Sequence, residues 1–123
     1  MNTTFILLWM VFMHIVDDFC LQKPYLCDMK QKSWWGNVDS LYKHDYIWAL
    51  IMHAFSWTFM IMLPIAFVQG FKISLLFLVL FDINWSVHIV VDNLKANEKK
   101  INLWHDQLIH LAQIVITAWV LIG

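Results

Sequence analysis

Four long apolar segments, separated by short polar stretches, constrain this chain more than any other feature of its sequence. They cover approximately residues 4–21, 46–68, 71–92 and 101–122. About 20 helical residues cross the ~30 Å hydrocarbon layer of a bilayer. Backbone polar groups must be paired inside that layer, so such segments span it as helices. We therefore predict an all-α fold, a polytopic membrane protein whose four-helix transmembrane bundle forms a single domain over residues 1–123.

Composition excludes a soluble domain and a nucleic-acid-binding protein. Apolar residues make up 61% of the chain and charged residues 14%, against roughly half and about a quarter in soluble domains. A soluble chain of this size buries only about two-thirds of its surface, which is too little to hide so many apolar side chains. The net charge is -1 and no arginine is present, so a nucleic-acid partner is not expected. The expected surroundings are a lipid bilayer.

Lysine placement predicts the orientation of the bundle. Polar segments next to transmembrane helices carry more lysine on the cytoplasmic side. The first and third connections hold seven of the eight lysines, and the second holds one. We therefore expect both termini outside, the first and third connections in the cytoplasm, and a bacterial inner membrane as the location. Two cysteines near the first connection are then expected to be free thiols. The lysines are Lys23, Lys30, Lys32, Lys43, Lys95, Lys99 and Lys100 on one side and Lys72 on the other, and the cysteines are Cys20 and Cys27.

Ionisable side chains inside the apolar segments indicate where a function lies. Such a group costs a few kcal/mol in the membrane, so it is by default a functional candidate. Residues four apart share one face of a helix, and three of the segments carry an imidazole and a carboxylate at that spacing. At a rise of 1.5 Å per residue, four histidines lie roughly 10–15 Å from the cytoplasmic end. The pairs are His14 with Asp18, His88 with Asp92, and Asp106 with His110, and His53 is the fourth histidine.

Imidazoles and carboxylates on facing bundle helices are how metal sites are built in helical cores. Imidazole suits Zn, Fe, Cu and Ni, and carboxylates add oxygen ligands. Because the set exceeds one tetrahedral shell, it fits either two metals or one metal with hydrogen-bonded outer carboxylates. A proton relay or a structural polar network uses the same residues. The predicted ligands of a divalent metal, with Zn one possibility, are His14, Asp18, His53, His88, Asp92, Asp106 and His110.

Four further ionisable residues are expected to lie outside this cluster or at its margin. Asp17 is expected to face another direction and reach headgroup water. His105 should point away from its neighbour Asp106, and His44 should be solvated in the first connection. Asp82 lies deeper on the third segment, and its position leaves open whether it lines a cavity.

The ordered motifs resemble a small bacterial and phage integral-membrane family of unknown function, domain of unknown function 3307. The stretch HIVDDFCLQ at His14 to Gln22 is similar to that family's His-x3-Asp-Phe-x-Leu-Gln opening. The resemblance implies a polytopic membrane protein with the His/Asp residues as its signature, and it implies no activity. A looser similarity joins the His-x3-Asp helix to membrane-bound, metal-dependent hydrolases. The other matching pieces are Lys30 and Lys32, His53, HIVVDNLK at 88–95 and DQLIH at 106–110.

Three functional hypotheses follow. The first is a membrane-embedded, metal-dependent hydrolase acting from the cytoplasmic side on a lipid-linked or phosphorylated substrate. Its catalytic residues would be Asp18, Asp92, Asp106 and Lys95, with Lys95 and the amides of Gln22 and Gln107 orienting an anionic group. The second is a proton or metal transporter or a channel-like protein, which four short helices would form as a homo-oligomer. The third is a small membrane interaction protein, for example a phage-encoded one, whose polar core only joins helices.

Overall fold

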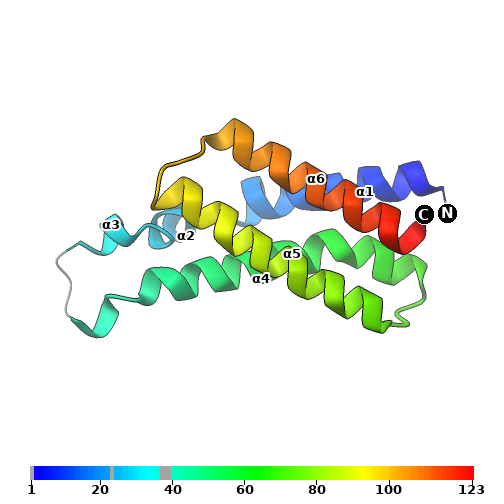
Figure 1. Cartoon of the computed structure of the whole chain (residues 1–123), viewed down its shortest axis with the longest axis horizontal. Helices are drawn as coiled ribbons and strands as arrows, with labels where there is room; N and C mark the ends of the chain where they lie inside the picture. The colour runs from blue at the N-terminus through cyan, green and yellow to red at the C-terminus, as the bar shows by residue number, and fades with distance from the viewer. Residues whose placement is uncertain (1, 23, 37–39) are drawn as a thin grey trace.

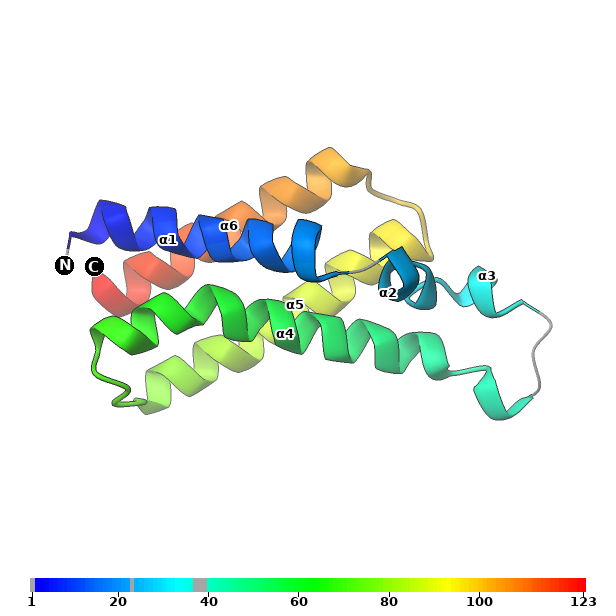
Figure 2. The same cartoon turned by 180° about the vertical axis from the view of Figure 1, so that it is seen from behind.

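The computed structural model describes residues 2–22, 24–36 and 40–123, and these parts of the chain are helical without a strand. Four long helices lie side by side in an up-and-down bundle, with both termini at the same end (Figures 1 and 2). Each is long and apolar enough to cross a membrane. They are Thr3–Leu21, made of α1 (Thr3–Ile15) and η1 (Val16–Leu21), then α4 (Asp45–Val68), α5 (Leu75–Ala96) and α6 (Leu103–Ile122). The predicted all-α transmembrane fold is confirmed.

Side-chain exposure agrees with a bilayer around the bundle. Large apolar side chains point outward from every long helix, including Leu8 at 63%, Leu75 at 78% and Trp119 at 72% exposure. In water such a surface would be strongly unfavourable, whereas lipid tails solvate it without cost. The chain is therefore a multi-pass membrane protein.

The first span changes its helical geometry half-way along. After Ile15 the chain continues as a π-helix, and its end is marked by the bond from the Gln22 amide to the Asp17 carbonyl, five residues back (2.9 Å). A π-turn is wider than an α-turn and shifts the direction in which the following side chains point. As a consequence both Asp17 and Asp18 are turned toward the bundle interior, with exposures of 1% and 10%.

The third span is displaced by about one turn from the predicted range of 71–92. The backbone of Phe71 has a positive φ of 60°, and the Ser74 hydroxyl caps the helix by accepting from the Phe77 amide at 3.1 Å. The helix then continues through Asp92 to Ala96, because nothing in that stretch breaks it. The fourth span begins at Leu103 rather than 101, capped by the preceding asparagine.

The first connection is more ordered than a polar loop. It holds α2 (Pro24–Met29), α3 (Lys32–Trp35) and the 3-10 turn η2 (Ser40–Tyr42), and α2 contacts α4. These short helices lie at the end of the bundle opposite the termini (Figure 2). Lys23, counted in the orientation argument, lies outside the described residues.

Candidate functional site

All four predicted histidines lie in one buried layer of the bundle. His14 comes from α1, His53 from α4, His88 from α5 and His110 from α6, and each is at most 2% exposed. The ring centroids of His88 and His110 are 4.1 Å apart, those of His53 and His88 are 5.1 Å apart, and those of His14 and His110 are 5.9 Å apart. The equal depth inferred from residue spacing therefore corresponds to real proximity.

His88 is at the centre of this layer. Its ring is stacked against Trp57, at a centroid distance of 4.4 Å, and against His110, and the Trp57 and His110 centroids are themselves 5.0 Å apart. Neither ring nitrogen has a hydrogen-bond partner among the described residues. Its Nε2 lies 3.6 Å from Asp92 Oδ2. A fully buried imidazole with two unpartnered nitrogens is unfavourable unless another species binds it.

Hydrogen bonding fixes the tautomer of His110 and leaves one nitrogen available. Gln113 donates its amide to Asn84, so its Oε1 can only accept, and it receives the His110 Nδ1 hydrogen at 2.9 Å. A neutral His110 therefore carries a lone pair on Nε2, the nitrogen that faces Asp106 Oδ1 at 3.1 Å. This arrangement, with one nitrogen donating to an amide and the other free, is how metal-binding histidines are usually oriented.

His14 differs because both of its nitrogens have partners. The Trp57 indole donates to Nδ1 at 2.8 Å, so Nε2 carries the hydrogen and donates to Gln107 Oε1 at 2.8 Å. His14 as a metal ligand stays a prediction, and ligation would require it to give up one of these bonds.

Two carboxylates and His53 form the side of the cluster nearest the first connection. His53 Nε2 lies 3.3 Å from Asp18 Oδ1 and 3.6 Å from Asp92 Oδ2. These distances place one imidazole between carboxylates from two other helices. Asp106 completes the set from α6, where it is 1% exposed.

The structure corrects the expectation for Asp17. Its side chain does not reach headgroup water but is buried, and it accepts a hydrogen bond from the Ser56 hydroxyl at 2.5 Å. Its other oxygen lies 3.8 Å from His53 Nδ1. The four-residue spacing rule assumes α-helical geometry, and the π-turn of η1 breaks that assumption at this position.

Lys30 is a member of the site that residue spacing did not reveal. It follows α2, is 2% exposed, and its Nζ donates to Asp92 Oδ2 and to Gln22 Oε1, both at 2.7 Å. A second lysine, Lys95, donates to Asp106 Oδ2 at 3.3 Å. For Lys30, the only sequence signal was its place in the family motif, because the short helix α2 that precedes it has no periodic pattern.

The side-chain amides of Gln22 and Gln107, which were predicted to orient an anionic group, belong to the hydrogen-bond network of this cluster. Gln107 donates to Asp106 Oδ2 at 3.0 Å and to Asp18 Oδ2 at 3.3 Å while accepting from His14. Gln22 accepts from Lys30. Both amides therefore hold protein side chains in place, and their predicted contact with an anionic group is not tested by this geometry.

Six of the seven predicted ligands fall into groups that could hold a metal ion. In each group, one ligand atom per residue lies within 4.8 Å of the others. Because the groups share members, they describe adjoining positions in one cluster. The groups are Asp18–His53–His88, His88–Asp92–His110 and Asp18–Asp106–His110.

A cavity of about 220 Å³ leads into this cluster from the end of the bundle that carries α2. Its polar walls include both lysines, so an anion entering it would meet positive charge. Phe19, Cys27 and Leu103 supply apolar lining. The remaining lining residues are Asp18, Gln22, Lys30, His53, Asp92, Lys95 and Gln107.

A second, smaller set of polar side chains lies deeper in the bundle and was not predicted. Asn84 donates to Thr117 Oγ1 at 2.7 Å, and Gln113 donates to Asn84 Oδ1 at 3.1 Å. Their sequence signal is the four-residue spacing of Asn84 with His88 and of Gln113 with Thr117. These uncharged bonds join α5 to α6 and support the orientation of His110.

The other ionisable residues lie away from the cluster. His105 and His44 are exposed, as expected. Asp82 is also exposed, on the outer face of α5. Cys20 and Cys27 are free and exposed, in agreement with the prediction.

Four membrane-spanning helices around a buried His/Asp/Lys cluster define a polytopic membrane protein with a polar core. The sequence model of the family described as protein of unknown function (DUF3307) matches residues 6–123, and the chain belongs to that family. No curated protein and no solved structure matches it.

Proposed function

We propose that this protein is a membrane-embedded, metal-dependent hydrolase acting on a lipid-linked or phosphorylated substrate. The observation that carries the proposal is the set of buried nitrogen and carboxylate atoms that lack hydrogen-bond partners among the described residues. These atoms are on His88, His110, Asp17 and Asp106. Imidazole nitrogens with free lone pairs beside carboxylates are the donor set that Zn²⁺ and similar ions prefer.

The charge of the cluster also supports a divalent cation. Four carboxylates face two ammonium groups in this layer, so two negative charges remain when the histidines are neutral. Uncompensated charge in a low-dielectric interior is costly. One divalent ion would balance it. The charged groups are Asp17, Asp18, Asp92 and Asp106 with Lys30 and Lys95.

The cavity supports hydrolysis of an anionic substrate over simple metal storage. A bound divalent metal supplies a water of lowered pKa as nucleophile. Asp18 and Asp92 line the cavity and are the groups that would accept the proton from this water. Lys30 and Lys95, on the same wall, would hold a phosphate group. The volume of about 220 Å³ suits a headgroup or phosphoryl group, whereas the rest of the substrate would remain outside.

Metal content of detergent-purified protein, measured by elemental mass spectrometry, is the first test. We expect about one divalent ion or more per chain in the wild type and none in the double variant His88→Ala/Asp92→Ala. The matched control is His105→Ala/Asp82→Asn, which changes one exposed histidine and one exposed aspartate. It should retain the metal.

Hydrolysis of a chromogenic phosphomonoester, measured with the same three proteins, follows metal content. Activity in wild type and control, with loss in the double variant, supports the hydrolase. A wild type that stays metal-free after reconstitution with Zn²⁺, Mn²⁺ and Fe²⁺ would refute the metal and favour a proton relay or a structural network. Metal that survives the loss of both residues would place the site elsewhere.

The orientation and the membrane belong to the same proposal: a bacterial inner membrane, both termini outside, and the cavity open to the cytoplasm. Lys30 and Lys95 serve the core, but Lys32, Lys43, Lys99 and Lys100 still outnumber Lys72 at the opposite end, so the positive-inside argument holds. Reporter fusions at the C-terminus and in the first connection near Asn37, which lies outside the described residues, test it. Cytoplasmic activity of the C-terminal fusion would reverse the orientation.

A further inference from the structure

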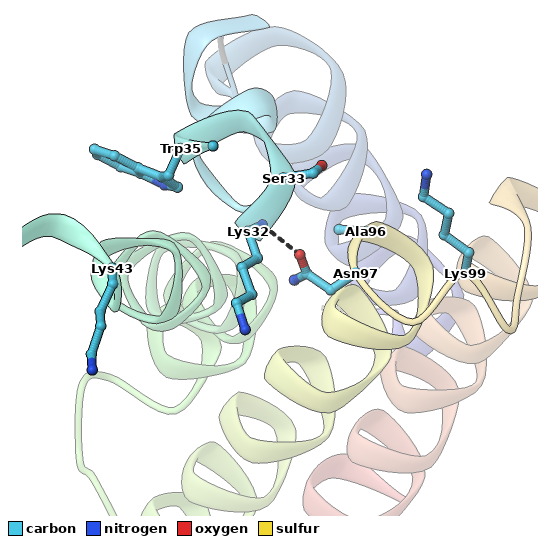
Figure 3. Close-up of a pocket in the computed structure, with 8 residues that line it drawn as sticks. Lys32, Ser33, Trp35, Lys43, Ala96, Asn97 and Lys99 are labelled. Carbon is cyan, nitrogen blue, oxygen red and sulfur yellow. Dashed lines mark hydrogen bonds between the residues drawn. The ribbon is translucent and has the colours of Figure 1, made fainter. Parts of the chain in front are cut away.

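A basic pocket, separate from the His/Asp cluster, lies where the first connection meets the turn between α5 and α6. Its volume is about 650 Å³. Three lysines from three different segments surround it: Lys32 on α3, Lys43 just before α4, and Lys99 just after α5 (Figure 3). Among the residues that the structure describes, no acidic side chain lines it, and the lining also includes Ser33, Trp35, Gly36, Ala96 and Asn97.

The lysines of this pocket differ from the other basic residues of the chain. Lys30 and Lys95 are paired with buried carboxylates, and Lys100 lies 3.6 Å from Glu98. In contrast, Lys32 and Lys99 are exposed, and they line a pocket that has no acidic residue among its described lining residues. Lysines from separate segments that line one pocket surround it with positive charge, which favours a bound anion.

Asn97 holds the two walls of the pocket together. Its side-chain oxygen accepts from the Lys32 backbone amide at 2.6 Å, and its side-chain nitrogen donates to the Lys30 carbonyl at 2.9 Å (Figure 3 draws the first of these bonds). One asparagine at the end of α5 thus fixes the segment that sends Lys30 into the core and Lys32 to the pocket. These two bonds fix the walls of the pocket relative to each other, and such preorganisation lowers the entropic cost of binding.

An aromatic cluster beside the lysines places the pocket at the depth of lipid headgroups. Trp35 packs against Trp34 at a centroid distance of 5.0 Å and is stacked with Tyr42 at 6.5 Å. Tryptophan and tyrosine favour the interface between hydrocarbon and water. This preference argues for a position of the lysines at the depth of the lipid phosphates.

We propose that this pocket binds a phosphate-bearing anion, presented by the headgroup of an anionic phospholipid or by a soluble phosphate compound. Lysine ammonium groups bind phosphate as mobile point charges. The number of lysines and the open volume suit a headgroup with its phosphate rather than a bare ion. This inference goes beyond the hydrolase proposal, because it concerns binding at residues outside the His/Asp cluster.

The test is a titration of the full-length protein in neutral detergent, followed by native mass spectrometry. The probes are short-chain phosphatidylglycerol, phosphatidylcholine and inorganic phosphate. The double variant Lys32→Gln/Lys99→Gln is compared with Lys72→Gln/Lys100→Gln, which loses the same charge from exposed positions outside the pocket. Each lysine near an anionic surface contributes about fivefold in affinity, so phosphatidylglycerol should bind the first variant about 30-fold more weakly than the wild type. The control should change by less than about twofold.

The arms distinguish the source of the phosphate. Binding of phosphatidylglycerol that inorganic phosphate does not displace supports the lipid headgroup, and displacement by inorganic phosphate supports a soluble ligand. Equal weakening in both double variants, or in neither, overturns the pocket. Metal content should be unchanged in all of these proteins, so the result is independent of whether the His/Asp cluster binds metal.

Discussion

The two halves of the bundle interior are built from the same four helices, but one half is apolar and the other is polar. Toward the termini, the core is apolar and closely packed, with Ile61, Ile65 and Ile114 fully buried. Toward the first connection, the interior holds histidines, aspartates and a lysine, and several of their polar atoms lack partners among the described residues. Trp57 lies at the boundary, in contact with both. The comparison suggests that one half holds the helices together so that the other can carry a costly polar arrangement.

The cost of the polar half is greatest where a charge is buried. Lys30 is balanced by Asp92 at 2.7 Å, and the two side chains are only 2% and 3% exposed. Removing one partner of such a pair typically costs roughly 3–5 kcal/mol, whereas replacing both by apolar groups is often neutral. The apolar half contains no pair with this property among its described residues.

The largest expected effect comes from breaking that pair. Asp92→Asn should lower the free energy of unfolding by roughly 3–5 kcal/mol, because it removes the carboxylate that pairs directly with the buried Lys30 ammonium. Unfolding by SDS titration measures this change. Adding Lys30→Met should restore most of the stability without restoring bound metal. An Asp92→Asn protein as stable as the wild type would show that Lys30 does not depend on this carboxylate.

The apolar half should respond to a change of volume and not of charge. Ile61→Ala removes a fully buried side chain, and such truncations cost roughly 2–5 kcal/mol in soluble cores. We expect the lower part of that range, because lipid removes the hydrophobic contribution and leaves the packing loss. Metal content per folded chain should not change. A loss of metal here would mean that the two halves are not independent.

Trp57 tests the boundary between the halves. Trp57→Phe keeps an aromatic ring beside His88 but removes the indole hydrogen bond to His14 Nδ1. Loss of a hydrogen bond that orients a metal site typically weakens metal affinity 10- to 100-fold. Because His14 has no direct place in the metal-holding groups, we expect the lower end, about tenfold. Metal titration of the two proteins after chelation measures it, and an unchanged affinity would confine the role of Trp57 to packing.

The smallest effect is expected in the uncharged polar set that lies beyond the histidine layer, on the side of the termini. Thr117→Val removes the hydroxyl that accepts from Asn84 Nδ2 at 2.7 Å and keeps the shape of the side chain. Hydrogen bonds between transmembrane helices contribute about 0.6 kcal/mol on average, so the SDS-unfolding free energy should fall by about that amount. A loss of several kcal/mol would show that this set supports His110 more strongly than its bond count indicates.

Much of the fold could be predicted from the sequence, because hydropathy and length suffice to identify spanning helices. Helix ends were less predictable: the third span moved by about a turn because the Ser74 cap and the positive φ of Phe71 decide where it starts. The short helices of the first connection depend on tertiary contacts with α4, which local sequence does not encode.

The histidine layer could be predicted because α-helical spacing and depth are regular. The positions of Asp17 and Lys30 could not be predicted from helical spacing, because they depend on local backbone geometry and on tertiary contacts. Asp17 faces inward through a π-turn, and Lys30 arrives on a loop helix that has no repeat. Trp57 could have been predicted from helical spacing, because it lies four residues after His53 on α4. A tryptophan in an apolar segment, however, ordinarily serves only hydrophobic packing.

The π-turn at Val16–Leu21 also makes the first span sensitive to its exact length. Each residue added to or removed from an α-helix rotates everything on one side of the change by about 100° and shifts it by 1.5 Å. A one-residue deletion between His14 and Asp18 that converted this turn to α-geometry would carry His14 away from Trp57 and Gln107 while Asp18 stayed in place. Chains of this family could therefore tolerate substitutions here more readily than changes in length. A deletion scan of residues 16–21, compared with alanine substitutions at the same positions, would measure that difference as loss of folded protein.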